Sequence, residues 1–95
     1  MLPEKGQNRL KDWQVYLIKC ADSTLYCGVT KDLETRLQKH NQGTASRYTR
    51  SRLPVELAAV RKGLTKEQAF KLEYRIKKLS AKNKIIALKN MEIGI

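Results

Sequence analysis

The chain has 95 residues, a formal net charge of +11 and 41% apolar residues. That length and composition fit one small folded domain, and they exclude a second hydrophobic core and a chain that is disordered by composition. A charge of this size opposes folding through self-repulsion, so it needs a reason. Nucleic acid is the usual partner of such a chain, and the alternatives are an anionic membrane surface or a generic basic surface on a soluble protein.

The first third of the chain predicts a flexible start and then a β-hairpin. Residues 1–12 are polar and lack the apolar stretch of a signal peptide. Residues 14–20 and 25–29 are nearly uncharged and rich in β-branched and aromatic side chains, which favours two strands. The segment 21–24 between them has the composition of a turn, so the strands are expected to pair as a hairpin.

The remainder of the chain combines helical patterns with one more strand. Thr30 or Asp32 can cap the first helix, Thr65 the second and Ser80 the third. In chain order we expect a helix that includes Leu33 and Leu37 and ends within 41–43, and then a basic loop over 43–54. A strand over 55–60 follows, with Gly63 as its terminator, and then helices from 66 to about 79 and from 81 to about 89. The order β-β-α-β-α-α predicts an α+β fold, in which a small three-stranded antiparallel sheet is flanked by helices.

The positive charge is distributed unevenly over the single domain that we expect at 13–89, ahead of a short tail at 90–95. Residues 31–52 hold six Lys or Arg and two acids, and residues 61–84 hold nine and two, whereas the first 30 residues are nearly balanced. The excess belongs to the helices and the basic loop, which indicates a binding face rather than a uniformly solvated surface.

Glu73 is a carboxylate beside the apolar side of the helix predicted at 66–79. At about 100° per residue, Leu72 and Ile76 lie in one apolar arc of that helix, and Glu73 falls next to it. A carboxylate in such a place is costly unless something pairs with it. Two interpretations are open: an ion pair with Arg36 or a nearby lysine, or a ligand for a hard divalent cation.

Arg36 and His40 are four residues apart on the first predicted helix, so they share a face beside the apolar positions Leu33 and Leu37. His40 is the only histidine in the chain. A lone histidine in such a place is typical of a hydrogen-bonded packing residue, and an arginine of a surface cation whose stem covers apolar neighbours. The alternative is that both side chains belong to a functional site.

Tyr16 and Tyr26 stand in the middle of the two predicted strands, where tyrosine normally packs into a core. Side chains alternate between the faces of a strand, so Gly28 shares a face with Tyr26 and leaves room for another group. The two tyrosines share a face only if paired residue numbers sum to an even value, which puts Gly28 opposite Tyr16. That register requires a hairpin loop of odd length, for example 21–23 with a bulge.

Taken together, these residues resemble the GIY-YIG nuclease superfamily, and the chain looks closest to its short single-domain bacterial members of uncharacterised role. The resemblance rests on an ordered set of residues: Tyr16, Tyr26-Cys27-Gly28, Arg36, His40 and Glu73. It covers roughly residues 13–82 of the chain. The chain departs from the motif at Gln14 and Cys27, and we interpret both as changes in packing.

The resemblance implies a metal-dependent endonuclease that hydrolyses phosphodiester bonds, in DNA rather than RNA, with a structure-specific and repair-related role. Tyr16 and Tyr26 would position and deprotonate the attacking water, and His40 would accept or relay a proton near Tyr16. Arg36 would contact the scissile phosphate, and Glu73 would hold one Mg²⁺ or Mn²⁺ ion. We also expect Arg36, His40 and the metal ion to lower the pKa of the catalytic tyrosine, which is otherwise a poor base.

Nucleic acid is expected to contact one set of basic and aromatic side chains: Arg47, Tyr48, Arg50, Arg52 and Lys77. The arginines of the basic loop would contact phosphates, and its tyrosine would stack on a base. The alternative for this segment is a merely solvated loop. Some members of the superfamily carry a late polar amide near the site, and Asn83 is the candidate for it here.

Two other functions stay open on the sequence alone: a non-catalytic nucleic-acid-binding module on the same fold, and a basic amphipathic protein that acts at membranes or on acidic partners. A protein partner for targeting is a further expectation. Cys20 and Cys27 lack the spacing of a metal site and fit buried, reduced thiols, so we expect a cytoplasmic protein. The longest apolar runs, 57–60 and 85–88, are too short to span a bilayer.

Overall fold

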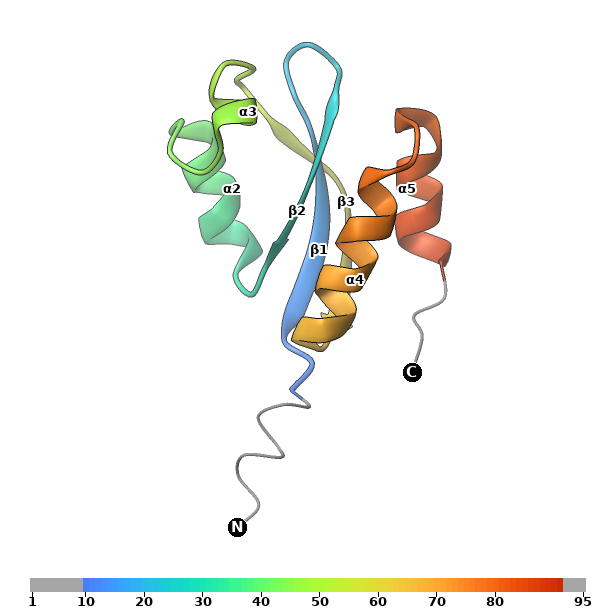
Figure 1. Ribbon diagram of the computed structural model, residues 1–95. Coiled ribbons are helices and arrows are strands. Elements are labelled where there is room, and N and C mark those ends of the chain that lie inside the picture. The colour runs from blue at the N-terminus through green and yellow to red at the C-terminus, as the bar shows by residue number, and fades with distance from the viewer. Residues whose placement is uncertain (1–9, 92–95) are drawn as a thin grey trace.

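A computed structural model gives the arrangement of residues 10–91 (Figure 1). Its elements in chain order are strands β1 (Trp13–Lys19) and β2 (Leu25–Thr30), helices α2 (Leu33–Asn41) and α3 (Arg47–Arg50), strand β3 (Glu56–Leu64), and helices α4 (Lys66–Lys77) and α5 (Ala81–Asn90). Nine residues of the expected N-terminal segment, 1–9, and four of the expected tail, 92–95, lie outside the described residues.

The three strands form one antiparallel sheet in the order β2-β1-β3, which confirms the predicted α+β fold. The central strand β1 buries four consecutive side chains, residues 15–18, because both faces of the sheet are covered. A strand that is buried on both sides does not need the polar alternation of a half-exposed strand, which explains the nearly uncharged sequence of this segment.

Helices cover the two faces of the sheet unequally, with α2 and α3 on one side and α4 and α5 on the other (Figure 1). Val15 and Leu17 belong to the larger core, whose buried members also come from β2, β3, α4 and α5. Tyr16 and Ile18 belong to a smaller buried cluster, against which Leu33 and Leu37 of α2 pack. Tyr16 and Tyr26 therefore lie on the face with the smaller core, whereas Glu73 belongs to α4 on the other face.

The hairpin has the register that places both tyrosines on one face of the sheet. Cys20 N–H donates to the Thr24 carbonyl at 2.8 Å, which leaves the three-residue loop 21–23. Ser23 has a φ of 72°, as expected at the bulge position of such a loop. Tyr16 consequently pairs with Gly28, and the predicted odd-length loop is confirmed.

Caps define the helices that carry the polar side chains of interest. Asp32, one of the two predicted caps, accepts a hydrogen bond from the Thr35 N–H at the start of α2. Thr65 and Gln68 form a capping box at the start of α4. Ser80 precedes α5 as expected but makes no side-chain cap hydrogen bond.

Two details of the predicted elements are wrong. The basic loop over 43–54 contains the four-residue helix α3, because Ser46 caps the Tyr48 N–H and Thr49 turns inward to full burial. The third strand does not end at Gly63 but continues to Leu64. Gly63 has a φ of 75° beside a register shift against β1, so it forms a bulge within the strand instead of ending it.

Among residues 10–91, no helix combines the length and the apolar character needed to cross a membrane.

We predict that Gly28→Ala lowers the free energy of unfolding by roughly 1–3 kcal/mol, the usual cost of overpacking a core. A Cβ at this position would overlap the Oη and Cζ atoms of Tyr16. Urea unfolding of Gly28→Ala alone and in a Tyr16→Leu background forms a double-mutant cycle. The penalty should shrink in the Tyr16→Leu background, and equal penalties in both backgrounds would contradict this packing.

Candidate active site

Tyr16, His40 and Thr49 form a buried chain of hydrogen bonds between the sheet, α2 and α3. The Tyr16 hydroxyl lies 2.9 Å from His40 Nε2, and His40 Nδ1 lies 2.8 Å from Thr49 Oγ1. None of the three residues is more than 1% exposed. A hydroxyl directed at an imidazole nitrogen in a site shielded from water is an arrangement suited to proton transfer.

Aromatic rings form one wall of this site. The Tyr26 ring centroid lies 5.3 Å from that of His40, and the Tyr48 ring stacks on Tyr26 at 5.9 Å. The Arg52 guanidinium lies 3.9 Å from the Tyr48 ring centroid, and its Nε donates to Asp22 at 2.9 Å. Arg52 thereby holds α3 against the hairpin loop that joins β1 and β2.

Glu73 approaches the site from α4, on the other side of the sheet edge. Its carboxylate is mostly buried and pairs with Lys77 Nζ at 3.0 Å, and that ammonium lies 5.9 Å from the Tyr26 ring centroid. Because β2 is an edge strand, side chains of α4 can reach around it. Desolvation chiefly, and the negative charge of Glu73 next, raise the pKa of the Cys27 thiol in β2.

Burial keeps Tyr16 protonated. Desolvation, and next the neighbouring Tyr26, raise the pKa of Tyr16 above its ordinary value, and the opposing effect of Arg36 is smaller. Arg36 lowers the pKa of Tyr16 as expected, but desolvation outweighs it. The sequence does not reveal how completely the phenol is removed from water.

His40 is held in its neutral form by the same burial. Desolvation, and next the positive charge of Arg36, lower the pKa of His40 below its ordinary value of 6.5. A neutral imidazole has a free nitrogen lone pair, so its chemistry permits it to accept a proton.

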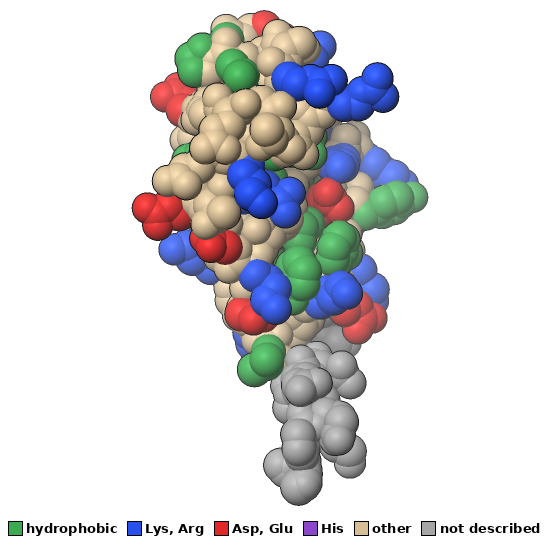
Figure 2. All heavy atoms as spheres, turned by 90° about the vertical axis from the view of Figure 1, so that its left-hand side faces the viewer, with side chains coloured by type: hydrophobic (Ala, Val, Ile, Leu, Met, Phe, Trp, Pro, Cys, Tyr) green, Lys and Arg blue, Asp and Glu red, His purple; other side chains and the backbone are tan. Residues whose placement is uncertain are grey.

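The surface around these buried groups carries charges of both signs. Figure 2 shows the face that carries α2 and α3, where Lys and Arg side chains are interspersed with Asp and Glu side chains. No histidine is visible on this face, in line with the burial of His40.

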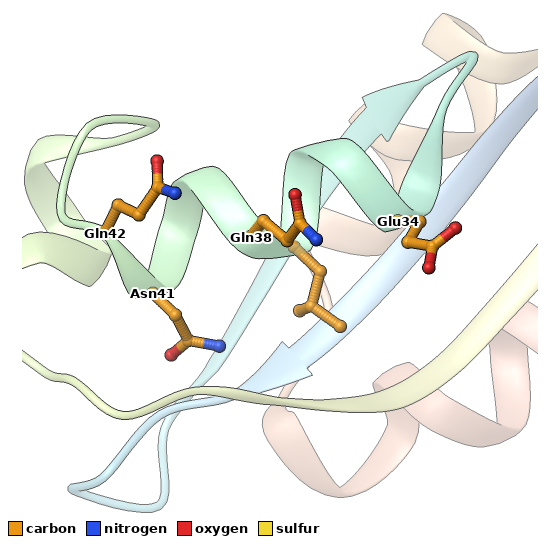
Figure 3. A pocket seen from close by; sticks show the side chains of 5 residues that line it. Glu34, Gln38, Asn41 and Gln42 are labelled. Carbon is orange, nitrogen blue, oxygen red and sulfur yellow. The ribbon is translucent and has the colours of Figure 1, made fainter.

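An open pocket on α2 is separate from this site. It is lined by Glu34, Leu37, Gln38, Asn41 and Gln42 (Figure 3). Asn41 is held by the backbone of Val55, which accepts from its amide at 3.2 Å and donates to its Oδ1 at 2.8 Å. None of the predicted site residues lines the pocket, so the candidate chemistry lies elsewhere.

Known proteins share both the sequence and the fold. The GIY-YIG catalytic domain matches residues 12–85. The chain belongs to the GIY-YIG family. It is 45% identical to a UPF0213 protein of Nitratidesulfovibrio vulgaris over 76 residues, which span 80% of this chain and 69% of the relative. A UPF0213 protein of Bacillus pumilus is also 45% identical, over 78 residues that span 82% of this chain and 80% of the relative.

Solved structures agree with this assignment. The chain is 37% identical to the UPF0213 protein of Bacillus halodurans, solved by NMR, with a TM-score of 0.50 over 83% of this chain and 86% of that one. It is equally similar in sequence to a protein of E. faecalis, also solved by NMR, with a TM-score of 0.57 over 86% of each chain. Membership in the short, uncharacterised branch of the GIY-YIG family is thus shown.

The GIY-YIG motif residues come together to different degrees. Tyr16 and Tyr26 each contact the His40 ring, Tyr16 also through a hydrogen bond. Arg36 is half-buried and close enough for its charge to act on both Tyr16 and His40. Glu73 reaches the group by way of Lys77 and Tyr26.

The remaining predicted residues differ in whether their side chains already make contacts within the protein. Arg47 and Arg50 are exposed, whereas Arg52 and Tyr48 contact each other. Asn83 lies in the first turn of α5 and donates to Ser80 Oγ at 3.2 Å.

Thr49 is the member of the site that the sequence does not reveal. It stands in a segment without helical periodicity, because α3 has only four residues. The pattern Ser46-x-x-Thr49 is the available signal, since a serine that can cap a helix precedes it by three positions. Nothing in that pattern identifies His40 as the partner.

The donor set for a divalent metal is small. GIY-YIG nucleases generally use a divalent metal, but residues 10–91 contain no cluster of three or more His, Cys, Asp or Glu side chains. One carboxylate is sufficient for a hydrated Mg²⁺, which keeps several waters. Glu73 fits this requirement, although the ion would have to share its carboxylate with Lys77.

We predict that His40 makes the folded protein less stable in mild acid. As pH falls, the unfolded chain takes up a proton near pH 6.5, and the folded chain does so only at a lower pH. The contribution of neutral His40 to the free energy of unfolding is therefore fully present above pH 6.5, and it is lost as the pH falls through the lowered pKa of the folded state. Urea unfolding at several pH values should show a steeper loss in the wild type than in His40→Gln. The same pH dependence in both proteins would refute this.

Proposed function

We propose that this protein is a divalent-metal-dependent endonuclease that hydrolyses phosphodiester bonds, in DNA rather than RNA, with a structure-specific role in repair in the cytoplasm. The observation that carries the proposal is the buried hydrogen bond between Tyr16 and His40, set beside the charges of Arg36 and Glu73 within a GIY-YIG fold. A structural core has no need for a phenol directed at a neutral imidazole.

The proton path follows from the protonation states. Tyr16 is protonated and His40 is neutral, so the phenol cannot remove a proton from water until it releases its own. His40 Nε2, at 2.9 Å, takes the Tyr16 proton as Tyr16 Oη takes one from the attacking water. The two transfers are coupled, which avoids a free phenolate in a buried site.

The charged residues around this pair act on the phosphate. Arg36 neutralises charge that grows on the phosphate oxygens during attack, and Lys77 is placed to add a second contact. Glu73 would hold Mg²⁺ or Mn²⁺, and such an ion supplies further charge neutralisation at the scissile phosphate.

Substrate binding is assigned to the exposed arginines of α3. Arg47 and Arg50 can contact phosphates without breaking existing contacts. Arg52 already donates to Asp22 and to the Tyr48 carbonyl, so its role is to position α3. Tyr48 stacks on Tyr26, and we assign it to the wall of the site in place of base stacking.

A second candidate is a nucleic-acid-binding module without turnover. The observation in its favour is the ion pair with Lys77, which satisfies the Glu73 carboxylate without any metal. The two functions differ in one result: the binding module forms complexes with oligonucleotides but yields no products with any metal.

We predict that the protein cleaves members of a panel of labelled DNA structures when Mg²⁺ or Mn²⁺ is present. Tyr16→Phe and Glu73→Ala should each lower the cleavage rate by at least about 100-fold, the usual contribution of a general acid or base. The matched controls are Tyr74→Phe and Glu67→Ala on the exposed side of α4, where Glu67 pairs with Lys71 as Glu73 does with Lys77. Cleavage that survives both site substitutions would remove these residues from the mechanism.

We further predict that Arg47→Ala and Arg50→Ala weaken DNA binding and flatten its salt dependence. Each lost phosphate contact should reduce the slope of log affinity against log salt by roughly 0.9. Arg52→Ala removes the same charge but should mainly lower the free energy of unfolding, because it breaks the contact between α3 and the hairpin loop. Fluorescence anisotropy and urea unfolding measure the two effects, and an unchanged slope in Arg47→Ala and Arg50→Ala would contradict the assignment.

A further inference from the structure

The Thr49 hydroxyl lies between an imidazole nitrogen and a backbone carbonyl. Its Oγ1 is 2.8 Å from His40 Nδ1 and 3.3 Å from the Ser46 carbonyl oxygen, to which it can donate. On the other side of the ring, Nε2 is 2.9 Å from the Tyr16 hydroxyl. Four groups thus form one line, from the Ser46 carbonyl through Thr49 and His40 to Tyr16.

The hydrogens on this line can be arranged in two ways. In the first, Thr49 donates to the Ser46 carbonyl and accepts from His40 Nδ1–H, which leaves Nε2 to accept from Tyr16. In the second, Thr49 donates to Nδ1, and Nε2–H donates to the Tyr16 oxygen. The two arrangements differ in which nitrogen of the neutral ring carries the hydrogen.

Counting donors and acceptors separates the two arrangements. In the first, every hydroxyl and ring hydrogen has an acceptor among the described residues. In the second, the Tyr16 hydroxyl hydrogen has none, since His40 is the only partner of this phenol within residues 10–91. A buried donor without a partner costs about 1–3 kcal/mol, so the first arrangement is favoured.

We infer that Thr49 is a positioning residue that holds the hydrogen of His40 on Nδ1 and leaves Nε2 free to receive the Tyr16 proton. The Ser46 carbonyl can only accept, so it directs the Thr49 hydrogen away from the ring and turns Oγ1 into an acceptor. This extends the proposed nuclease mechanism, since it explains how His40 is kept ready to accept a proton. The assignment itself concerns the protein without substrate or metal.

The short helix α3 keeps Thr49 in place. Ser46 Oγ accepts from the Tyr48 N–H at its start, and Arg52 donates to the Tyr48 carbonyl at 2.8 Å at its end. Ala21 N–H of the hairpin loop donates to the Arg52 carbonyl at 2.8 Å. These bonds fix α3 against the sheet, so the hydroxyl cannot follow the imidazole if the ring turns.

The test is NMR of the protein with ¹⁵N-labelled histidine at a pH above 7. The chain has one histidine, so the spectrum reports His40 alone. The wild type should show Nδ1 protonated and Nε2 without hydrogen. Thr49→Val, which keeps the shape but removes the acceptor, should move population to the Nε2–H form, and Thr49→Ser should restore the wild-type pattern. Tyr16→Phe should leave the hydrogen on Nδ1.

Several results would overturn the inference. If the His40 ring of the wild type is protonated on Nε2, the inference is overturned directly. This result needs no variant, so the inference can be refuted even if Thr49→Val folds poorly. An unchanged tautomer in folded Thr49→Val, or a move to Nε2–H in Tyr16→Phe, also overturns the inference, because the hydrogen would then be placed by another group.

Cleavage assays provide a second reading. Thr49→Val should lower kcat by roughly 10- to 100-fold, as when the orienting partner of a functional histidine is removed, with KM little changed and Thr49→Ser close to wild type. If no variant or wild type cleaves DNA, the proposed nuclease function fails while the NMR result still decides the role of Thr49. If the wild type cleaves and the tautomer is wrong, this inference alone fails.

Discussion

The hydrogen bond between Tyr16 and His40 is the interaction on which the proposed chemistry depends, because it joins the central strand to α2 across the smaller core. Its geometry depends on three local features. The hairpin register sets the phenol over Gly28, the missing side chain at that glycine gives it room, and Thr49 fixes the far side of the imidazole. Loss of any one of these features would disturb the hydrogen bond between Tyr16 and His40.

Burial and charge have opposite effects in this site. Removal from water favours the uncharged forms of both Tyr16 and His40, so the pair rests as a neutral hydroxyl and a neutral ring. Arg36 and the paired Glu73 and Lys77 supply the charges near it. Such a centre has little charge of its own to repel an incoming phosphate, and the surrounding cations supply the attraction.

The sequence predicts those parts of the fold that follow from local pattern. Strand composition and the parity of the hairpin give the register of Tyr16 and Gly28, and the caps at Asp32 and Thr65 give the starts of two helices. The sequence does not predict Thr49, because a four-residue helix has too few positions to show a period. Nor does it predict the raised pKa of Tyr16, since the depth of burial depends on the packing of α2 and α3 over the strand.

The two layers of the protein differ in how strongly each is held, and the proposed site spans both. Tyr16 belongs to a strand buried on both sides, whereas His40 and Thr49 sit in the layer with the smaller core. Segments with few buried apolar contacts open more readily than the rest of a protein. Backbone amides of α2 and α3 should therefore exchange with solvent before those of β1. Such partial opening would separate the imidazole from the phenol while the sheet stays folded, so the proposed activity should be lost on gentle warming, well before global melting.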